Sequence, residues 1–131
     1  MRIRAIAGAV AGATAAAGLM AVTATPAHAN GSTKPICVAK AYEMYACFTP
    51  KGDKFCITNK SKIKGNYVDI EFFAPYKGKG GRVVNKKGYN KTVCKSYASY
   101  LKEGERVNFH AWLYNKGGVA IDVTKDKSAT I

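Results

Sequence analysis

Short runs of alternating apolar and polar residues follow one another along most of the chain. In the clearest run, residues 106–114, alternate positions are occupied by Val107, Phe109, Ala111 and Leu113. The positions between them hold Asn108, His110, Trp112 and Tyr114. Because successive side chains of a β-strand point to opposite faces, this segment is predicted to be a strand with one apolar core face and one mixed face.

The same alternation, with β-branched and aromatic residues, predicts further strands. They cover residues 44–49, 53–58, 67–73, 82–85, 91–97 and 119–123. Residues 36–43 fit either a strand or a short helix, and the proline and glycines of 75–81 are expected to form an irregular connection. Six to eight short strands at intervals of about 10 residues predict an all-β fold, a small antiparallel β-sandwich or a partly open barrel.

The two ends of the chain are expected to differ from this domain. Arg2 and Arg4, the Ala/Gly/Val-rich run that follows them and the sequence Ala27-His28-Ala29 have the form of a secretory signal peptide, residues 1–29. Its cleavage leaves about 102 residues, the size of one domain. Residues 30–36 are predicted to be a flexible tail, 37–124 the β-domain and 125–131 a second polar tail. No second apolar stretch is long enough to span a membrane.

Four cysteines remain after the signal peptide: Cys37, Cys47, Cys56 and Cys94. An even number of cysteines in an exported chain predicts two disulfides rather than a metal site. If residues 50–53 form a tight turn, Cys47 and Cys56 lie opposite each other across a hairpin. Of the three possible pairings, this argument favours Cys47–Cys56 with Cys37–Cys94.

The charge of the chain narrows the classes of partner. The whole sequence has a net charge of +13, and the mature form, with 19 basic and 8 acidic residues, has a net charge of +11. Only Arg82 and Arg106 among the mature basic residues are arginines, whose bidentate guanidinium is usual in nucleic-acid recognition. We therefore expect no nucleic-acid partner, and instead another secreted protein or an anionic cell-envelope surface.

Little in the sequence supports catalysis. His110 is the single histidine of the mature chain, and it lies in mid-strand rather than on a loop near a serine. One histidine does not supply the ligands of a catalytic metal, so no metal and no cofactor are expected. Asp69 and Glu71 share a strand face about 7 Å apart, a carboxylate pair that suits glycosidic chemistry. No aromatic sugar platform is evident around them, and pairing with lysines explains them more simply, so we expect a protein that is not an enzyme.

The mixed face of residues 106–114 is the best candidate contact surface. Trp and Tyr are enriched at binding hot spots, so His110, Trp112 and Tyr114 are predicted either to contact a partner or to pack in the core of a second sheet. Tyrosines elsewhere are expected to add aromatic surface nearby: Tyr89, Tyr97 and Tyr100.

Lysines crowd the central loops: Lys77, Lys79, Lys86, Lys87 and Lys91. They either dock an anionic surface or keep the protein soluble. We include Lys86 and Lys87 in the predicted partner-binding set.

One stretch resembles a known group of proteins. The sequence Ala46-Cys47-Phe48, followed by the Gly52-Asp53 turn, is similar to small exported actinobacterial proteins that are common in Streptomyces. Further matches follow in the same order: Gly81-Arg82, Gly88, Cys94, Glu103-Gly104 and Val107 to Phe109. The resemblance extends from Ala46 to about Trp112 and implies a secreted β-rich domain without a catalytic residue.

The chain also departs from that group. Val83-Val84 stands where the group usually has a cysteine, and Cys37 and Cys56 look like additions. The resemblance therefore implies no disulfide pairing.

These observations predict a secreted, non-enzymatic protein-binding or assembly module, for instance an adaptor subunit of an extracellular toxin or inhibitor complex. The alternative is a cationic antimicrobial or antifungal effector that acts on envelope surfaces. The absence of an amphipathic helix makes direct membrane disruption the weaker form of this alternative.

Overall fold

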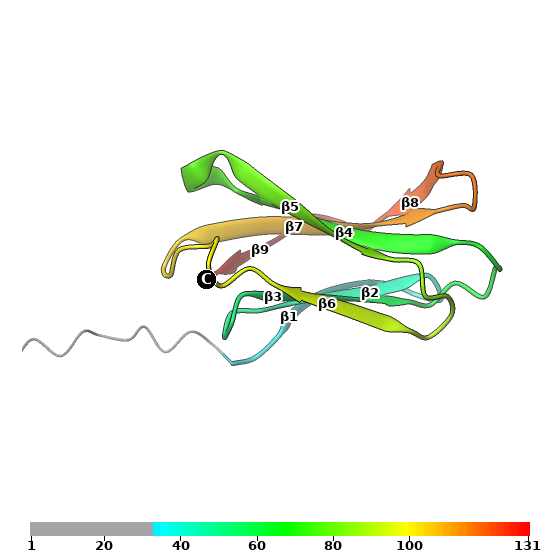
Figure 1. Cartoon of the computed structure of the whole chain (residues 1–131), viewed down its shortest axis with the longest axis horizontal. Coiled ribbons are helices and arrows are strands. Elements are labelled where there is room, and N and C mark those ends of the chain that lie inside the picture. The colour runs from blue at the N-terminus through cyan, green and yellow to red at the C-terminus, as the bar shows by residue number, and fades with distance from the viewer. Residues whose placement is uncertain (1–32) are drawn as a thin grey trace, which may run out of the picture.

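The computed structural model describes residues 33–131, so the predicted signal peptide lies outside the described residues. Nine strands and one short 3-10 helix follow one another (Figure 1). They are β1 (Ile36–Lys40), β2 (Met44–Thr49), β3 (Lys54–Asn59), β4 (Tyr67–Ala74), η1 (Pro75–Lys77), β5 (Lys79–Asn85), β6 (Thr92–Ser96), β7 (Arg106–Tyr114), β8 (Ala120–Val123) and β9 (Lys127–Thr130). The described chain is all-β, as the alternating pattern predicts.

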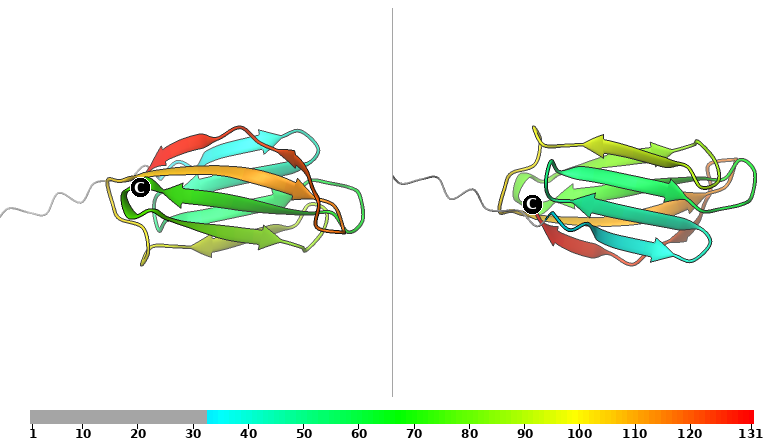
Figure 2. Two further views of the ribbon diagram at one scale, coloured as in Figure 1. Left: turned by 90° about the horizontal axis from the view of Figure 1, so that it is seen from above. Right: turned by 90° about the horizontal axis from the view of Figure 1, so that it is seen from below.

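The strands form two antiparallel sheets that pack face to face as an open sandwich (Figure 2). The first sheet has the order β1-β2-β3-β6, and the second has the order β5-β4-β7-β8. Strand β9 also pairs with β7, beside its first half, while β8 pairs with its last residues. This arrangement makes β4 and β7 the central strands of the second sheet and leaves β5 at one edge.

The core lies between the inner faces of the two sheets. The four apolar residues of β7 are buried as the alternation predicts: Val107, Phe109, Ala111 and Leu113. Phe55 of β3 is fully buried near the centre, with its ring centroid 4.4 Å from that of Phe72 and 5.9 Å from that of Phe109. Phe48 of β2 is the register partner of Phe55 in the same sheet, and their ring centroids are 4.7 Å apart. Phe72 and Phe109 belong to the other sheet, so aromatic rings from both sheets meet across the core.

The predicted disulfide pairing is wrong, although the hairpin on which it rests is correct. Cys47 and Cys56 are register partners across β2 and β3, but the bonds join Cys37 to Cys47 and Cys56 to Cys94. Cys37 is also the partner of Cys47, and Cys94 the partner of Cys56, so the four cysteines form one row across four strands. A Cys47–Cys56 bond would leave the outer two cysteines about 14 Å apart, beyond the reach of a disulfide.

The predicted C-terminal tail is in part a strand. β9 pairs with Arg106 to Phe109 of β7, and Ala129 and Ile131 are buried. The backbone N–H of Ile131 donates to the carbonyl of Glu105, which fixes the end of the chain. One alanine and one terminal isoleucine are too few for a visible alternating pattern, which is why the sequence did not reveal this strand.

Two other segments are also strands. Residues 36–40 form β1 rather than a helix, and β5 begins at Lys79, inside the predicted irregular connection. Phe72 of the neighbouring strand β4 lies too close to Gly80 and Gly81 for a side chain at either position. A Cβ atom on Gly81 would lie 2.5 Å from the Phe72 ring, and a Cβ atom on Gly80 would lie 2.4 Å from the Phe72 carbonyl oxygen. In this strand glycine allows close packing instead of ending the sheet.

Candidate functional site

The outer face of the second sheet carries the aromatic residues predicted as a contact surface. His110, Trp112 and Tyr114 project from β7 on the side away from the core and are half-buried. Tyr67 of β4 is the register partner of Tyr114, and the two rings stack with centroids 4.9 Å apart and planes 7° from parallel. We call these four residues the aromatic face.

A buried carboxylate lies within this face. Asp69 of β4 is the register partner of Trp112, and its side chain has no exposed surface. Arg82 of β5 reaches over β4 to form an ion pair with Asp69, and its guanidinium lies 5.3 Å from the Tyr114 ring. Burial raises the pKa of Asp69 despite the opposing effect of Arg82, and burial also raises the pKa of Tyr114. The second oxygen of Asp69, Oδ1, is buried without a hydrogen-bond partner.

His110 links the aromatic face to two further carboxylates. Its Nδ1 lies 2.8 Å from Oδ1 of Asp126, and its Nε2 lies 3.4 Å from Oε2 of Glu71. Its ring meets that of Trp112 edge to face, with centroids 5.6 Å apart. The histidine is thereby held in one orientation beside Trp112.

These contacts make a polar network but not an open catalytic pair. Asp69 and Glu71 do share a strand face, yet Asp69 lies beneath Arg82, so an external substrate does not reach its carboxylate. Among residues 33–131, no group of three or more His, Cys, Asp and Glu side chains could hold a metal ion. The rings of His110 and Tyr114 lie next to that of Trp112, with centroids 5.6 Å and 6.5 Å from its own.

The buried carboxylate predicts a pH effect on stability that Asp69→Asn should remove. Because its pKa is raised in the folded state, the folded protein takes up this proton at a higher pH than the unfolded chain. Asp69 therefore adds stability at low pH that is lost as the pH rises through its folded-state pKa. In urea unfolding from about pH 7 down to about pH 4, the wild type should gain stability relative to the Asp69→Asn variant.

The neighbouring substitution Glu71→Gln keeps Asp69 and is the matched control; it should follow the wild-type trend. If the difference in the free energy of unfolding between wild type and Asp69→Asn does not change with pH, Asp69 is not the group that takes up the proton on folding.

The structure separates the two predicted partner-binding lysines. Lys86 lies with its Nζ 5.0 Å from the centre of the Tyr67 ring, so it extends the aromatic face. Lys87 belongs to the following loop, where its backbone N–H donates to the side chain of Asn85. The Lys87 side chain is exposed. In the described part of the chain, the cations over the Tyr67 and Tyr114 rings are those of Lys86 and Arg82, not that of Lys87.

The other tyrosines lie elsewhere. Tyr97 and Tyr100 pack edge to face against Phe72 at the margin of the core, and their hydroxyls donate to carbonyls of β5. Tyr89 lies in the loop between β5 and β6. None of the three extends the aromatic face.

The sequence reasoning missed a second surface, at the end of the sandwich where four connections meet. These are the turn 41–43 and the loops 60–66, 86–91 and 115–119, which we call the loop end. It lies on the right in Figure 1 and includes the loop of the β7–β8 hairpin. The strand registers bring the connections together: Met44 pairs with Asn59, Val68 with Asn85.

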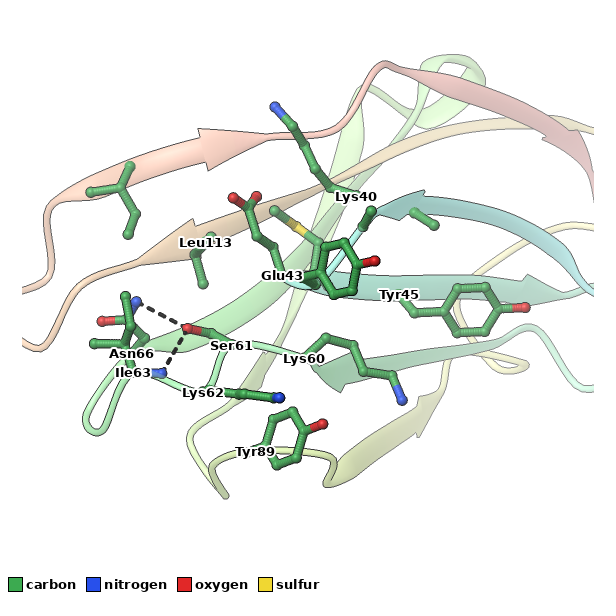
Figure 3. Close-up of a pocket in the computed structure, with 15 residues that line it drawn as sticks. Lys40, Glu43, Tyr45, Lys60, Ser61, Lys62, Ile63, Asn66, Tyr89 and Leu113 are labelled. Atoms are coloured by element: carbon green, nitrogen blue, oxygen red, sulfur yellow. Dashed lines mark hydrogen bonds between the residues drawn. The ribbon is translucent and has the colours of Figure 1, made fainter.

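A groove of about 880 Å³ opens at the loop end (Figure 3). Met44 and Leu113 are buried at its base, and Ile63, Tyr89 and Ile121 are exposed on its walls. In Figure 3 the Ser61 hydroxyl accepts hydrogen bonds from Asn66 and from the backbone of Ile63, which hold one wall of the groove. The alternating pattern gave no sign of it because these residues come from separate strands and loops.

None of the described helical segments is long and apolar enough to cross a membrane. No protein-family model matches the chain, and no curated protein or solved structure matches it.

Proposed function

We propose that this chain is a secreted, non-enzymatic binding module that docks another secreted protein on its aromatic face. The observation that carries the proposal is the position of Trp112, flanked by His110 and Tyr114 on the outer face of the second sheet, where all three side chains remain partly exposed. Tryptophan and tyrosine with an adjacent arginine are the residue types that dominate protein interfaces. The two disulfides support an oxidising, extracellular setting.

The ring geometry favours a protein partner over a sugar. Tyr67 and Tyr114 stack on each other, and Arg82 and Lys86 lie over their rings, so these tyrosines do not form a flat open platform. The charged groups around Trp112 have both signs, with Arg82 and Lys86 on one side and Glu71 beside His110. A mixed polar rim around a central aromatic residue is the usual anatomy of a protein–protein interface.

Trp112→Ala is expected to weaken partner binding strongly without unfolding the protein. Loss of a central aromatic anchor typically costs at least about 2 kcal/mol of binding energy, or roughly a 30-fold loss of affinity. Tagged, oxidised mature protein (residues 30–131) would be used to capture partners from the culture supernatant of the producing organism, with quantitative mass spectrometry. Wild type should retain a stoichiometric secreted protein that Trp112→Ala does not.

The matched control is Tyr45→Ala, an exposed aromatic residue on the outer face of the opposite sheet, which should keep the partner. Equal capture by wild type and Trp112→Ala would refute the assignment of this face. So would a Trp112→Ala variant that unfolds, because Trp112 would then serve the fold.

A further inference from the structure

We propose that the loop end is a docking surface for an anionic phospholipid bilayer. This inference goes beyond the proposed function, because it uses residues outside the aromatic face and stands whether or not that face binds a protein. It rests on three observations: the charge of the four connections, the apolar side chains exposed among them and the rigidity of the loops.

The charge at the loop end has one sign. Its four connections contain seven lysines and one acidic residue, Glu43. The lysines are Lys60, Lys62, Lys64, Lys86, Lys87, Lys91 and Lys116. The connections at the opposite end, residues 50–53, 75–78 and 97–105, contain three lysines and three acidic residues. A lysine near an anionic membrane surface is worth about 1 kcal/mol, so only one end of the sandwich has a strong attraction to it.

The acidic groups near the groove do not oppose this attraction strongly. Asp122 forms an ion pair with Lys40. Burial, followed by the neighbouring Asp122 side chain, raises the pKa of Glu43, which favours its neutral form. The lysines of the two longer loops are exposed, apart from the half-buried Lys60, whose Nζ donates to Asn90.

Large apolar side chains are exposed among these lysines. Tyr42 is 89 % exposed, Ile63 67 % and Val119 60 %, and Tyr89 and Ile121 are about half exposed. An anionic polymer offers phosphates but no apolar phase for such side chains. A bilayer offers both, since tyrosine and aliphatic residues enter the interface while lysines contact headgroups. The combination therefore favours a membrane over a polymer.

The two longer loops, which carry Ile63, Tyr89 and six of the seven lysines, are held firmly in place. Asn59 is fully buried, where its side chain donates to the Asn66 carbonyl and accepts from the backbone of Ser61. Asn85 is also fully buried and donates to the carbonyls of Ile57 and Lys91, joining the two sheets. A surface that is ordered before binding loses little conformational entropy when it binds.

The first test removes charge from the loop end. Lys62, Lys64 and Lys116 are exposed and would be replaced together by glutamine. Binding of the mature protein to vesicles of phosphatidylglycerol and phosphatidylcholine would be measured by co-sedimentation, with pure phosphatidylcholine vesicles as the neutral surface. The triple variant should bind on the order of 100-fold more weakly than wild type. Replacing Lys51, Lys54 and Lys102 at the opposite end changes net charge equally and should have a much smaller effect.

The second test removes the apolar contacts and keeps the charge. Tyr42 has a positive φ of 64°, a conformation that asparagine tolerates well, so Tyr42→Asn combined with Ile63→Ser should preserve the fold. This variant should lose at least about tenfold in vesicle affinity, whereas Phe73→Ser, at an exposed apolar residue outside the loop end, should not.

Three outcomes would overturn the proposal. Wild type that binds neutral and anionic vesicles equally, or neither, excludes an anionic-membrane surface. Binding to soluble polyphosphate as tight as to vesicles, unaffected by the Tyr42 and Ile63 changes, assigns the lysines to a polymer instead. Equal losses from both lysine triples would mean that net charge alone acts. Trp112→Ala should bind vesicles like wild type, which separates this test from that of the proposed function.

Discussion

Replacing Cys56 and Cys94 together with alanine should lower the free energy of unfolding by about 4 kcal/mol. The bond between them joins residues 38 positions apart, and in the chain-entropy model a longer loop restricts the unfolded chain more. Small domains have total stabilities of about 5–15 kcal/mol, so this variant should be close to unfolding at physiological temperature. Urea unfolding followed by the fluorescence of the single tryptophan would measure the loss.

The Cys37→Ala, Cys47→Ala double variant is the matched control. Its disulfide spans only 10 positions, which predicts a smaller loss of about 3 kcal/mol. Both members of a pair must be replaced, because Cys47 and Cys56 are register neighbours and a single free thiol there would lie beside the remaining disulfide. If removal of Cys37–Cys47 costs as much as removal of Cys56–Cys94, loop length does not explain how these bonds stabilise the fold.

Phe55→Ala should destabilise the protein by about 3–5 kcal/mol. The ring is fully buried and contacts aromatic rings of both sheets: Phe48, Phe72, Tyr97 and Phe109. Its removal loses apolar burial and leaves a cavity at the junction of the sheets, which rigid neighbouring strands close only in part. The loss would be seen as a lower midpoint of urea unfolding with an unchanged slope.

Phe73→Ala removes the same side chain from the outer face of β4, where Phe73 is 48 % exposed, and should change stability by no more than about 0.5 kcal/mol. Similar losses for the two phenylalanines would show that the core is not where the aromatic contacts place it.

The two proposed surfaces adjoin each other in the structure. The aromatic face lies on the outer face of the second sheet and ends at Tyr67 and Tyr114, the first residue of β4 and the last of β7, next to the loops 60–66 and 115–119 of the loop end. Lys86 is the residue that belongs to both, since it starts the loop 86–91 and lies over the Tyr67 ring. It is therefore left unchanged in the tests of either surface.

Much of the candidate site could be predicted from the chain itself. The alternation of residues 106–114 placed His110, Trp112 and Tyr114 on one strand face, because the period of two is a property of any extended strand. It did not show that Tyr67 stacks on Tyr114 or that Arg82 covers Asp69, because those contacts depend on which strands are neighbours.

The sequence by itself determined the all-β class, most strand positions and the hairpin that places Cys47 opposite Cys56, because alternation and turn residues act over a few positions. Only the tertiary structure decided the rest. Placing β1 and β6 on the two sides of that hairpin extended its two cysteines into a row of four, which determined the disulfides. Pairing of β9 with β7 buried the C-terminus, and the strand registers brought four loops to one end. These features join residues distant in sequence, and the burial of the shared core selects among the strand orders that local patterns allow.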